Sequence, residues 1–475
     1  MKILFLRPNS GIPAAPPPIG LMYLAGYLRK ARPGRDEMHF LDGRSELTPE
    51  SEVAETIERI KPDLVGITSF TMEGKVAHRY AELAKLHSPG CTVIIGGPYG
   101  TSDAAKALGD SHVDFAAQGE GELTLTRLIH RLEKPGADSA DLEMRNGWPH
   151  GLAYRQDGAI ISGTFPDLIQ NLDEIPYPAW DLIDLEKYFV TGKIRRATNP
   201  VQARKRGVAI FSTRGCPYRC TYCHNVFGKK LRKRSVENVL GEIRWLVEKF
   251  RIEDIEFIDD VFNLDRERAK AICDGIIQAG WKLYLAFPNG LRADQMDEEL
   301  VDKMRQAGAY RINYAVESGS PRIQKLIRKN LNLEKTRQII DYTAKKGIST
   351  GGFFMLGFRD ETEQEAWKTI NFALKTRLHT ASFFILTPFP NTPMYDEALA
   401  AGYDMDALYS DYGAVSANLS RMSNSELERL RKIAFRKFYF NPRRIWSIIR
   451  TTPAKWWLLE SFVRTVRISF LGKEY

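Results

Sequence analysis

The 475-residue sequence is poor in cysteine, in long apolar runs and, over most of its length, in excess charge. Its five cysteines are too few and too clustered for a secreted disulfide framework, so we expect a reducing compartment. No apolar stretch approaches the roughly 20 residues that cross a bilayer, and the N-terminus MKILFLRPNS lacks the pattern of a signal peptide. We therefore expect a cytoplasmic protein, with about three domains at roughly 150 residues each.

The net charge of +9 is confined to one end of the chain. Residues 421–475 hold 13 Lys and Arg against 4 Asp and Glu, which is +9, so the first 420 residues are neutral. A neutral main body lacks the basic surface that follows a nucleic-acid backbone. We therefore expect no nucleic-acid partner.

Four regions follow from the pattern of apolar residues and from the positions of Pro and Gly. Residues 1–140 alternate short β-branched strands with helices, which predicts an α/β domain with a doubly wound, Rossmann-like sheet. Residues 141–200 are rich in Pro and Gly and predict a linker with one hairpin. Residues 201–390 repeat six β/α units, which predicts a partial TIM-type barrel with its chemistry at the C-terminal strand ends. Residues 391–475 predict helices only.

Three of the five cysteines lie within eight residues, directly after the first predicted barrel strand. The segment STRGCPYRCTYCH (212–224) has the pattern C-x3-C-x2-C. A structural zinc site needs a fourth ligand, and His224 is too close to Cys223 to chelate the same ion. A [4Fe-4S] cluster fits better, because three irons take the thiolates of Cys216, Cys220 and Cys223 and the fourth iron stays open.

This pattern, with an aromatic residue before the last cysteine, resembles the radical S-adenosylmethionine (SAM) superfamily. The resemblance implies that SAM chelates the open iron through its amino and carboxylate groups. Reductive cleavage of SAM then yields a 5'-deoxyadenosyl radical, which takes a hydrogen atom from the substrate. An external donor such as ferredoxin or flavodoxin is expected to supply the electron.

Later segments are similar to motifs of the same superfamily and keep their order. YAVESG (314–319) resembles G-x-E-S-G, GFFMLGFRDET (352–362) resembles G-x4-G-x-P-x-E-T, and TPFPNTP (387–393) resembles the usual exit of the sixth strand. Ala315, Arg359 and Asn391 depart from the usual Gly, Pro and Gly. The implied SAM contacts are Tyr222, Asn289, Arg292, Glu317, Ser318 and Gly357. The alternatives are a salt-bridged strand end for Glu317 and a capped helix start for Asn289 and Arg292.

The N-terminal domain resembles the cobalamin-binding domain of the cobalamin-dependent radical SAM subfamily. The matching segments are RPN (7–9), PPPIGL (16–21), VGITS (65–69), GGPYGT (96–101) and GEGELT (119–124). All lie at the sheet edge where an open α/β sheet binds its ligand. The implied cobalamin contacts are Asn9, Ser69, Thr71, Gly96, Gly97, Thr101, Gly119, Glu120 and Gly121. The alternative is that the glycines form tight turns and the hydroxyl side chains cap helices.

One motif of other cobalamin domains is missing. Domains that supply a histidine to cobalt use D-x-H-x-x-G, whereas this chain has DGRSEL (42–47) after its second strand. We therefore expect that no histidine of the protein binds cobalt and that the dimethylbenzimidazole is displaced.

The resemblance implies a class B radical SAM methyltransferase that moves a methyl group from methylcobalamin to an unactivated carbon of a small molecule. The alternative is a non-methylating reaction with the same cofactors, such as cyclisation, ring rearrangement or oxygen insertion. Stoichiometry separates the two, because methylation consumes two SAM per product. A methylthiotransferase needs three further cysteines in the N-terminal domain, where only Cys91 lies. Cys91 and Cys273 are isolated thiols typical of a core. A non-enzymatic binding role leaves the cysteine loop unexplained.

The basic C-terminal region predicts three helices. SNSE (423–426) resembles a capping box, and Pro442 and Pro453 suit first helical positions. In the last helix the apolar side chains gather on one side, and these are Trp456, Leu459, Phe462, Val463 and Val466. Such a face predicts peripheral contact of residues 441–475 with an anionic inner-membrane surface, and with it a lipid, isoprenoid or tetrapyrrole substrate. The alternative is that these helices only cap the barrel.

Overall fold

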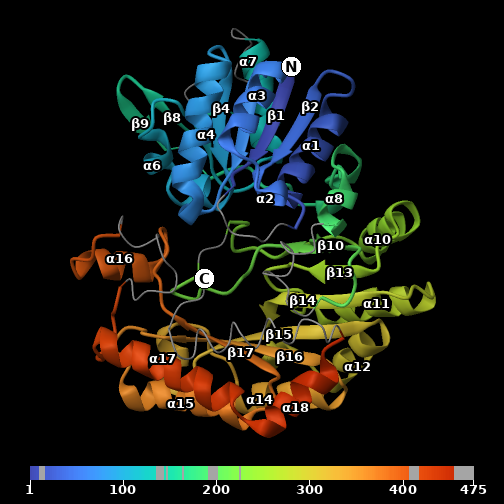
Figure 1. Cartoon of the computed structure of the whole chain (residues 1–475), viewed down its shortest axis with the longest axis vertical. Helices are drawn as coiled ribbons and strands as arrows, with labels where there is room; N and C mark the ends of the chain where they lie inside the picture. The colour runs from blue at the N-terminus through green and yellow to red at the C-terminus, as the bar shows by residue number, and fades with distance from the viewer. Residues whose placement is uncertain are drawn as a thin grey trace. The chain divides into compact units, whose positions relative to one another are not determined.

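The computed structural model describes residues 1–9, 16–134, 144–145, 148–162, 165–190, 202–223, 226–405 and 417–453. The chain divides into two compact units, one of residues 1–198 with 225–228 and one of residues 199–224 with 229–475. Each unit has its own sheet (Figure 1). Among the described residues, no helix is long and apolar enough to cross a bilayer.

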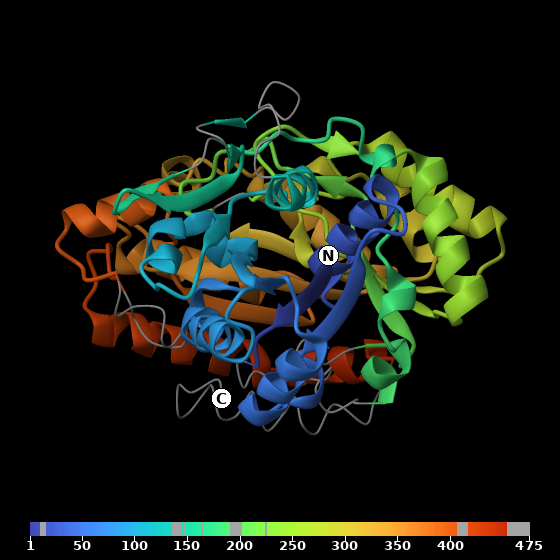
Figure 2. The same ribbon diagram turned by 90° about the horizontal axis from the view of Figure 1, so that it is seen from above.

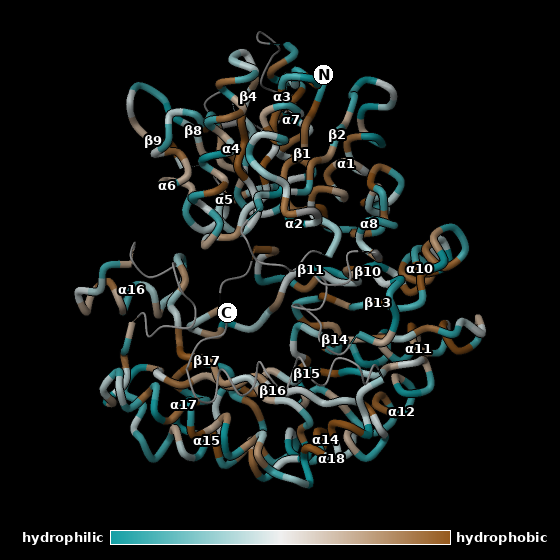
Figure 3. Tube along the Cα trace, in the orientation of Figure 1, coloured by the Kyte–Doolittle hydropathy of each residue, from teal (hydrophilic) through white to brown (hydrophobic). Residues whose placement is uncertain are grey.

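The first unit contains a seven-stranded sheet of order β2-β1-β3-β4-β5-β8-β9. Its parallel strands are β1 (Lys2–Arg7), β2 (Glu37–Asp42), β3 (Leu64–Thr68), β4 (Thr92–Gly96) and β5 (Phe115–Ala117). β1 is hydrophobic from Ile3 to Leu6 and β4 from Val93 to Ile95 (Figure 3), as expected for strands covered on both faces. The chain runs from β1 outward to β2 and then back past β1 to β3, so the predicted doubly wound topology is confirmed.

Helices pack on both faces of this sheet. α1 (Ile19–Ala31) and α7 (Glu122–Glu133) share one apolar cluster with β1, whereas α3 (Glu50–Ile60) and α4 (Gly74–His87) share the other. Short helices follow β2, β3 and β4 at their C-terminal ends, and these are α2 (Gly43–Glu46), η1 (Thr71–Glu73) and α5 (Gly97–Ser102). A further short helix, α6 (Ala104–Leu108), comes directly after α5. The first residues of α2, η1 and α5 therefore lie at the edge where a ligand was expected.

Part of the region that we predicted as a linker belongs to this sheet. β8 (Leu152–Gln156) and β9 (Ala159–Ile161) form a hairpin, and β8 pairs antiparallel with β5. The first three residues of β8 are buried, so the hairpin covers the edge and core that β5 would otherwise expose. The same unit includes a small pair of strands, β6 (Met144–Arg145) with β7 (Trp148–Pro149), and then η3 (Leu172–Glu174), η4 (Trp180–Leu182) and α8 (Leu185–Val190).

The second unit contains a six-stranded parallel sheet whose strands are adjacent in chain order, as predicted for a partial barrel. The strands are β10 (Gly207–Ile210), β13 (Asp254–Phe257), β14 (Tyr284–Leu291), β15 (Ala309–Glu317), β16 (Ser349–Leu356) and β17 (Thr380–Ile385). The connecting helices stand on one side of the sheet (Figures 1 and 2). They are α10 (Val236–Phe250), α11 (Arg266–Gln278), η5 (Ala293–Gln295), α12 (Glu298–Gln306), α13 (Pro321–Leu326), α14 (Leu333–Lys345) and α15 (Glu363–Lys375).

The C-terminal part of this unit is helical in its described residues, with α16 (Pro393–Ala400), α17 (Asn424–Tyr439) and α18 (Pro442–Thr451). Ser423 and Glu426 form the predicted capping box of α17, and Pro442 is the first residue of α18, as predicted. Tyr439 attaches α17 to β17, because its hydroxyl donates to the carbonyl of Ala381 at 2.9 Å. The helix expected after Pro453 lies outside the described residues.

Candidate active site

The cysteine loop (residues 215–223) follows β11 (Thr213–Arg214), which pairs antiparallel with β12 (Arg232–Lys233). Cys216, Cys220 and Cys223 form no disulfide. Desolvation raises the pKa of Cys216 and raises that of Cys223 to about 12, and the neighbouring Cys220 adds to both shifts. Three coupled thiols on one loop fit a cluster that takes three thiolates. Among the described residues, no group of three His, Cys, Asp or Glu is arranged to hold a metal ion.

Backbone hydrogen bonds and apolar packing hold the second half of the cysteine loop. The amide of Thr221 donates to the carbonyl of Ile327 at 3.1 Å, and the carbonyl of Thr221 accepts from the amide of Met394 at 3.2 Å. The ring of Tyr222 lies 5.9 Å from that of Phe358, within an apolar cluster at the C-terminal ends of β16 and β17. The aromatic residue before the last cysteine thus positions the loop on the sheet. Iron binding by the three cysteines stays a prediction.

A buried ion pair beside Tyr222 contains a residue that we did not predict. Lys329 Nζ lies 3.2 Å from Glu317 Oε1 and 3.3 Å from the Tyr222 hydroxyl oxygen. The backbone φ is 67° at Glu317, and it is 54° and 51° at Arg328 and Asn330, the two neighbours of Lys329. Non-glycine residues adopt such angles only where the surrounding structure imposes them. Glu317 is therefore a salt-bridged strand end, and its contact with SAM stays a prediction.

Arg292 and Asn289 lie at the end of β14 and have partners within the protein. The Arg292 guanidinium donates to Asp294 at 2.8 Å and to the carbonyl of Lys329 at 3.0 Å. It also lies 3.9 Å from the ring centroid of Tyr218, so it connects this strand end to the cysteine loop. Asn289 is exposed and donates to the carbonyl of Ile258 at 2.6 Å. The structure places Arg292 beside the loop, and the predicted binding of the SAM carboxylate by these two residues is still a prediction.

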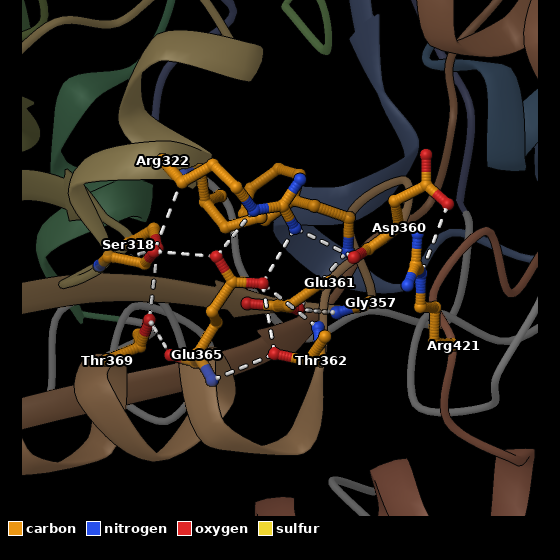
Figure 4. A network of polar contacts seen from close by, with 12 residues as sticks. Ser318, Arg322, Gly357, Asp360, Glu361, Thr362, Glu365, Thr369 and Arg421 are labelled. Atoms are coloured by element: carbon orange, nitrogen blue, oxygen red, sulfur yellow. Dashed lines mark hydrogen bonds and ion pairs between the residues drawn. The ribbon is translucent and has the colours of Figure 1, made fainter.

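Ser318 and Gly357 belong to a polar network at the ends of β15 and β16 (Figure 4). Ser318 is fully buried, and its hydroxyl lies 3.0 Å from that of Thr369. The amide of Gly357 donates to Glu361 at 2.7 Å, and burial raises the pKa of Glu361 to about 8. Neither predicted residue offers a side chain to a ligand, because that of Ser318 is buried and Gly357 has none.

Glu365 joins these two strand ends (Figure 4). Its carboxylate accepts from Arg322 at 2.6 and 2.7 Å, from the Ser320 hydroxyl at 3.1 Å and from the Thr362 amide at 3.1 Å. The hydrogen bonds from Arg322 lower the pKa of Glu365 to about 2. Ser320 belongs to the turn after β15 and Thr362 to the turn after β16. One carboxylate therefore fixes both turns that carry predicted SAM contacts.

Two adjacent acids after β13 were also missing from the predicted site. Asp259 is buried and accepts from the amides of Ser212 and Thr213, each at 2.6 Å, which fixes the chain leading into the cysteine loop. Burial and the adjacent Asp259 raise the pKa of Asp260 to about 6. A hydrogen bond from the backbone of Gly215 places the Asp260 carboxylate at the start of the cysteine loop. A pair of acids at a predicted barrel strand end was the signal that could have found them.

The predicted cobalamin residues gather where β1, β3, β4 and β5 end. Gly97 has a φ of 77°, and a Cβ there would lie 2.7 Å from Thr68 Oγ1. The Thr101 hydroxyl donates to the carbonyl of Gly97 at 2.8 Å and accepts from the amide of Gly119 at 3.0 Å, which links the turns after β4 and β5. Ser69 is buried and donates to the carbonyl of Phe70. These residues therefore help to build the edge itself, and neither hydroxyl group caps a helix start.

The remaining residues of this predicted site complete the same edge. Asn9 follows β1 and donates to the carbonyl of Thr48 at 3.1 Å, and Thr71 is the first residue of η1. Gly96 is the last residue of β4, and Glu120 is buried in the turn before α7. A Cβ at Gly121 would lie 2.9 Å from Leu24. Their contacts with cobalamin stay predictions.

The turn after β2 carries a buried charged cluster. Other cobalamin domains have the D-x-H-x-x-G motif, with its cobalt-binding histidine, at this turn. Arg7 lies 2.5 Å from Asp42, whose carboxylate also accepts from the Tyr188 hydroxyl at 2.6 Å. Arg44 pairs with Glu73, and burial lowers the pKa of Arg44 to about 10. The described residues of the turns after β1 to β5 include no histidine. The absence of a histidine ligand to cobalt stays a prediction.

Family models match each of the two units. The B12 binding domain matches residues 12–129, and the radical SAM superfamily matches residues 210–373. The chain is 31% identical over 454 residues to an uncharacterized methyltransferase of Pyrococcus horikoshii, and the match covers 93% of each protein. This chain belongs to the cobalamin-dependent radical SAM enzymes.

Other relatives show the range of this family. Identity to the cytidylyl-2-hydroxyethylphosphonate methyltransferase of Streptomyces wedmorensis is 30% over 455 residues, covering 85% of this chain and 82% of the relative. Identity to the anaerobic magnesium-protoporphyrin IX monomethyl ester cyclase of Rubrivivax gelatinosus is 27% over 405 residues, covering 84% and 70%. The solved structure of the cobalamin-dependent radical enzyme OxsB, with aqua-cobalamin and SAM bound, matches with a TM-score of 0.73 at 17% identity, covering 100% and 77%.

Membership of this family confirms the predicted fold class, the enzymatic nature of the protein and its three cofactors, a [4Fe-4S] cluster, SAM and cobalamin. Methylation has better support than cyclisation, because the methyltransferases of Pyrococcus horikoshii and Streptomyces wedmorensis match at 31% and 30% identity and the Rubrivivax gelatinosus cyclase at 27%.

Proposed function

We propose that this enzyme transfers a methyl group to an unactivated carbon of a small-molecule substrate. The supporting observation is that methyltransferase relatives match along both units, while the second unit keeps a cysteine loop flanked by the charged side chains of Lys329 and Asp260. When bound, the cluster and SAM supply the power to remove a hydrogen atom, and cobalamin supplies the methyl group. The protein contributes binding, orientation and the exclusion of water.

The charges around the cysteine loop suit the amino acid portion of SAM. That portion carries one ammonium and one carboxylate. Lys329 is a buried cation next to Tyr222 of the loop, and Asp260 is a carboxylate beside Cys216. We assign Lys329 to the carboxylate of SAM and Asp260 to its ammonium, because one cation and one anion beside the cysteine loop match the two opposite charges of that portion.

The test uses the anaerobically reconstituted enzyme with SAM, cobalamin and a reductant. Methylation predicts that S-adenosylhomocysteine and 5'-deoxyadenosine accumulate in equal amounts per product, because one SAM gives the methyl group and another is cleaved. The matched control replaces Cys216, Cys220 and Cys223 together by alanine, and it is expected to form no 5'-deoxyadenosine. Turnover that forms 5'-deoxyadenosine with no S-adenosylhomocysteine would exclude methyl transfer.

A second candidate is a radical reaction without methylation, such as cyclisation, ring rearrangement or oxygen insertion. The cyclase of Rubrivivax gelatinosus, which matches 84% of this chain, favours it. The same two measurements separate the candidates, since only methyl transfer consumes a second SAM for each product.

We also propose that the reducing electron comes from an external protein such as ferredoxin or flavodoxin. The sequence holds only two cysteines outside the loop, Cys91 and Cys273, and both are buried. Two isolated thiols on different units do not bind an auxiliary cluster. Cleavage of SAM that proceeds with reduced flavodoxin, and fails when the flavodoxin is left out, tests this point.

A further inference from the structure

Arg444 attaches α18 to the rest of the second unit. Arg444 donates to the carbonyls of Leu374 at 3.1 Å and Thr376 at 3.2 Å, and to that of Leu378. These carbonyls lie at and just beyond the C-terminal end of α15, where a cation is favoured by the helix dipole. The Arg444 guanidinium also lies 3.8 Å from the ring centroid of Phe438. The position of α18 is therefore fixed by a definite contact.

A different face of α18 is apolar and exposed. Trp446 is 67% exposed, Ile445 36% and Ile449 37%, and no residue of α18 is buried. Steps of three and four residues place Ile445, Ile448 and Ile449 in one stripe, with Trp446 beside it. A contiguous exposed apolar face on a soluble domain indicates an interaction surface.

The surroundings of this apolar face are basic. Residues 429–459 contain nine Lys and Arg and no Asp or Glu. Arg443 and Arg450 on α18, and Arg436 and Lys437 at the end of α17, are exposed. Basic side chains beside Trp and Ile on an amphipathic helix are typical of helices that lie in an anionic membrane interface.

We infer that α18 and the end of α17 dock on an anionic lipid surface, with the apolar face of α18 inserted at the headgroup level. A helix of 10 residues is too short to span the bilayer, so it lies in the plane of the interface. The apolar stripe favours lipid over nucleic acid, which would need only the positive charges. This inference concerns where the enzyme works and does not depend on the proposed methyl transfer.

The experiment measures co-sedimentation of the full-length protein with vesicles of phosphatidylcholine, with and without phosphatidylglycerol. Binding is expected only with phosphatidylglycerol, and it should weaken as salt is added. The variant Trp446→Ser with Ile449→Asn should bind at least about tenfold more weakly, because it removes two large apolar side chains from the interface. Arg443→Glu with Arg450→Glu should abolish the preference for anionic vesicles.

The matched control is Ile277→Asn, which removes an isoleucine of α11 that is 38% exposed, and it should bind vesicles like the parent protein. Equal vesicle binding by the parent and by the Trp446 and Ile449 double variant overturns the inference. So does a parent protein that ignores vesicles but loses a dimer, by light scattering, when the same two residues are replaced. Binding of a short DNA duplex, with no binding of vesicles, overturns it as well.

Discussion

The two strand-end edges of this enzyme are built in contrasting ways. In the second unit, ion pairs such as Glu317–Lys329 and Arg322–Glu365 stand at the strand ends. In the first unit, ion pairs of Arg7 with Asp42 and of Arg44 with Glu73 lie at the ends of β1 to β3, whereas the turns after β4 and β5 are shaped by glycines such as Gly97 and by hydroxyl groups bonded to the backbone. The contrast matches the cofactors, because SAM presents two opposite charges at a small group, whereas a corrinoid presents a broad surface. A single charge should therefore decide the binding of SAM in the second unit. The backbone shape of the turns should decide the binding of cobalamin in the first unit.

The largest effect is expected from the cysteines. Replacing Cys216, Cys220 and Cys223 together by alanine should abolish iron binding, the visible iron-sulfur absorption and 5'-deoxyadenosine formation. Cobalamin binding should persist, because the first unit has its own core. Cys91→Ala and Cys273→Ala are the controls and should keep their iron. An unchanged iron content in the triple variant would refute the cluster assignment.

The second effect tests whether one charge decides SAM binding. Lys329→Met should weaken SAM affinity by about 10- to 100-fold, the range expected on losing a buried charged hydrogen bond of about 1.5–3 kcal/mol. Cobalamin occupancy should not change. The affinity is measured by equilibrium dialysis of labelled SAM against the reconstituted enzyme.

Two further variants separate binding from folding at this position. Lys329→Arg keeps the charge and should restore part of the affinity. The double variant Lys329→Met with Glu317→Gln leaves no unpaired buried charge, so it should regain thermal stability without regaining SAM affinity. If Lys329→Met loses cobalamin and keeps SAM, the contrast between the two edges is wrong.

Most of the fold could be predicted because strands such as β3 and β4 are short apolar runs and the helices α10 to α15 each begin at a Ser, Thr, Asn or Asp cap. The hairpin β8–β9 lay in a region rich in Pro and Gly, and its place beside β5 depends on a long-range pairing that local pattern does not reveal. The predicted linker therefore contains part of the first sheet. The family resemblance supplied the cofactors, since spacing alone identified only the cluster.

The three cysteines of the site could be predicted from the sequence. The residues that surround them in space could be predicted less well. Lys329 stands between two residues in the left-handed region, Arg328 and Asn330, and nothing in the letters RKN signals such a turn. Its approach to Glu317 depends on tertiary packing. Asp260 was predictable in principle, as an acid at a strand end. Ser318 matched a motif, yet packing turned its side chain into the interior.

The third effect tests backbone shape at the first edge. Gly97→Ala places a Cβ at a φ of 77° and 2.7 Å from Thr68 Oγ1, which should strain the turn by about 1–2 kcal/mol. Cobalamin retention on a desalting column should fall several-fold, with SAM affinity unchanged. Gly90→Ala is the control, because a Cβ there meets nothing within 4 Å. Equal cobalamin retention by both variants would show that this turn does not shape the cofactor site.

The smallest effect concerns Glu365, which fixes two turns without offering a charge to the ligand. The pKa of Glu365 is about 2 in the folded protein, below its usual value, so its stabilising effect is complete above the usual pKa and is lost as the pH falls toward 2. Glu365→Gln should therefore lower the thermal midpoint at neutral pH. As the pH falls from about 4.5 to about 2, the midpoint should fall less in this variant than in the parent protein, because the parent protein loses the stabilising effect of Glu365 in that range. The expected loss of folding free energy is about 1 kcal/mol, because solvent around the half-exposed Arg322 side chain screens its ion pair with Glu365.

Glu334→Gln is the matched control for this change, since Glu334 pairs with Arg337 on an exposed helix surface and should shift the midpoint very little. SAM affinity in Glu365→Gln should drop only two- to threefold, roughly the effect of loosened turns rather than of a lost charge. Such a modest loss of SAM affinity would mean that Glu365, although charged, acts by fixing the shape of the turns, as Gly97 does at the edge of the first unit. A loss as large as that of Lys329→Met would mean that charge acts at this edge through the turns as well as through direct contact.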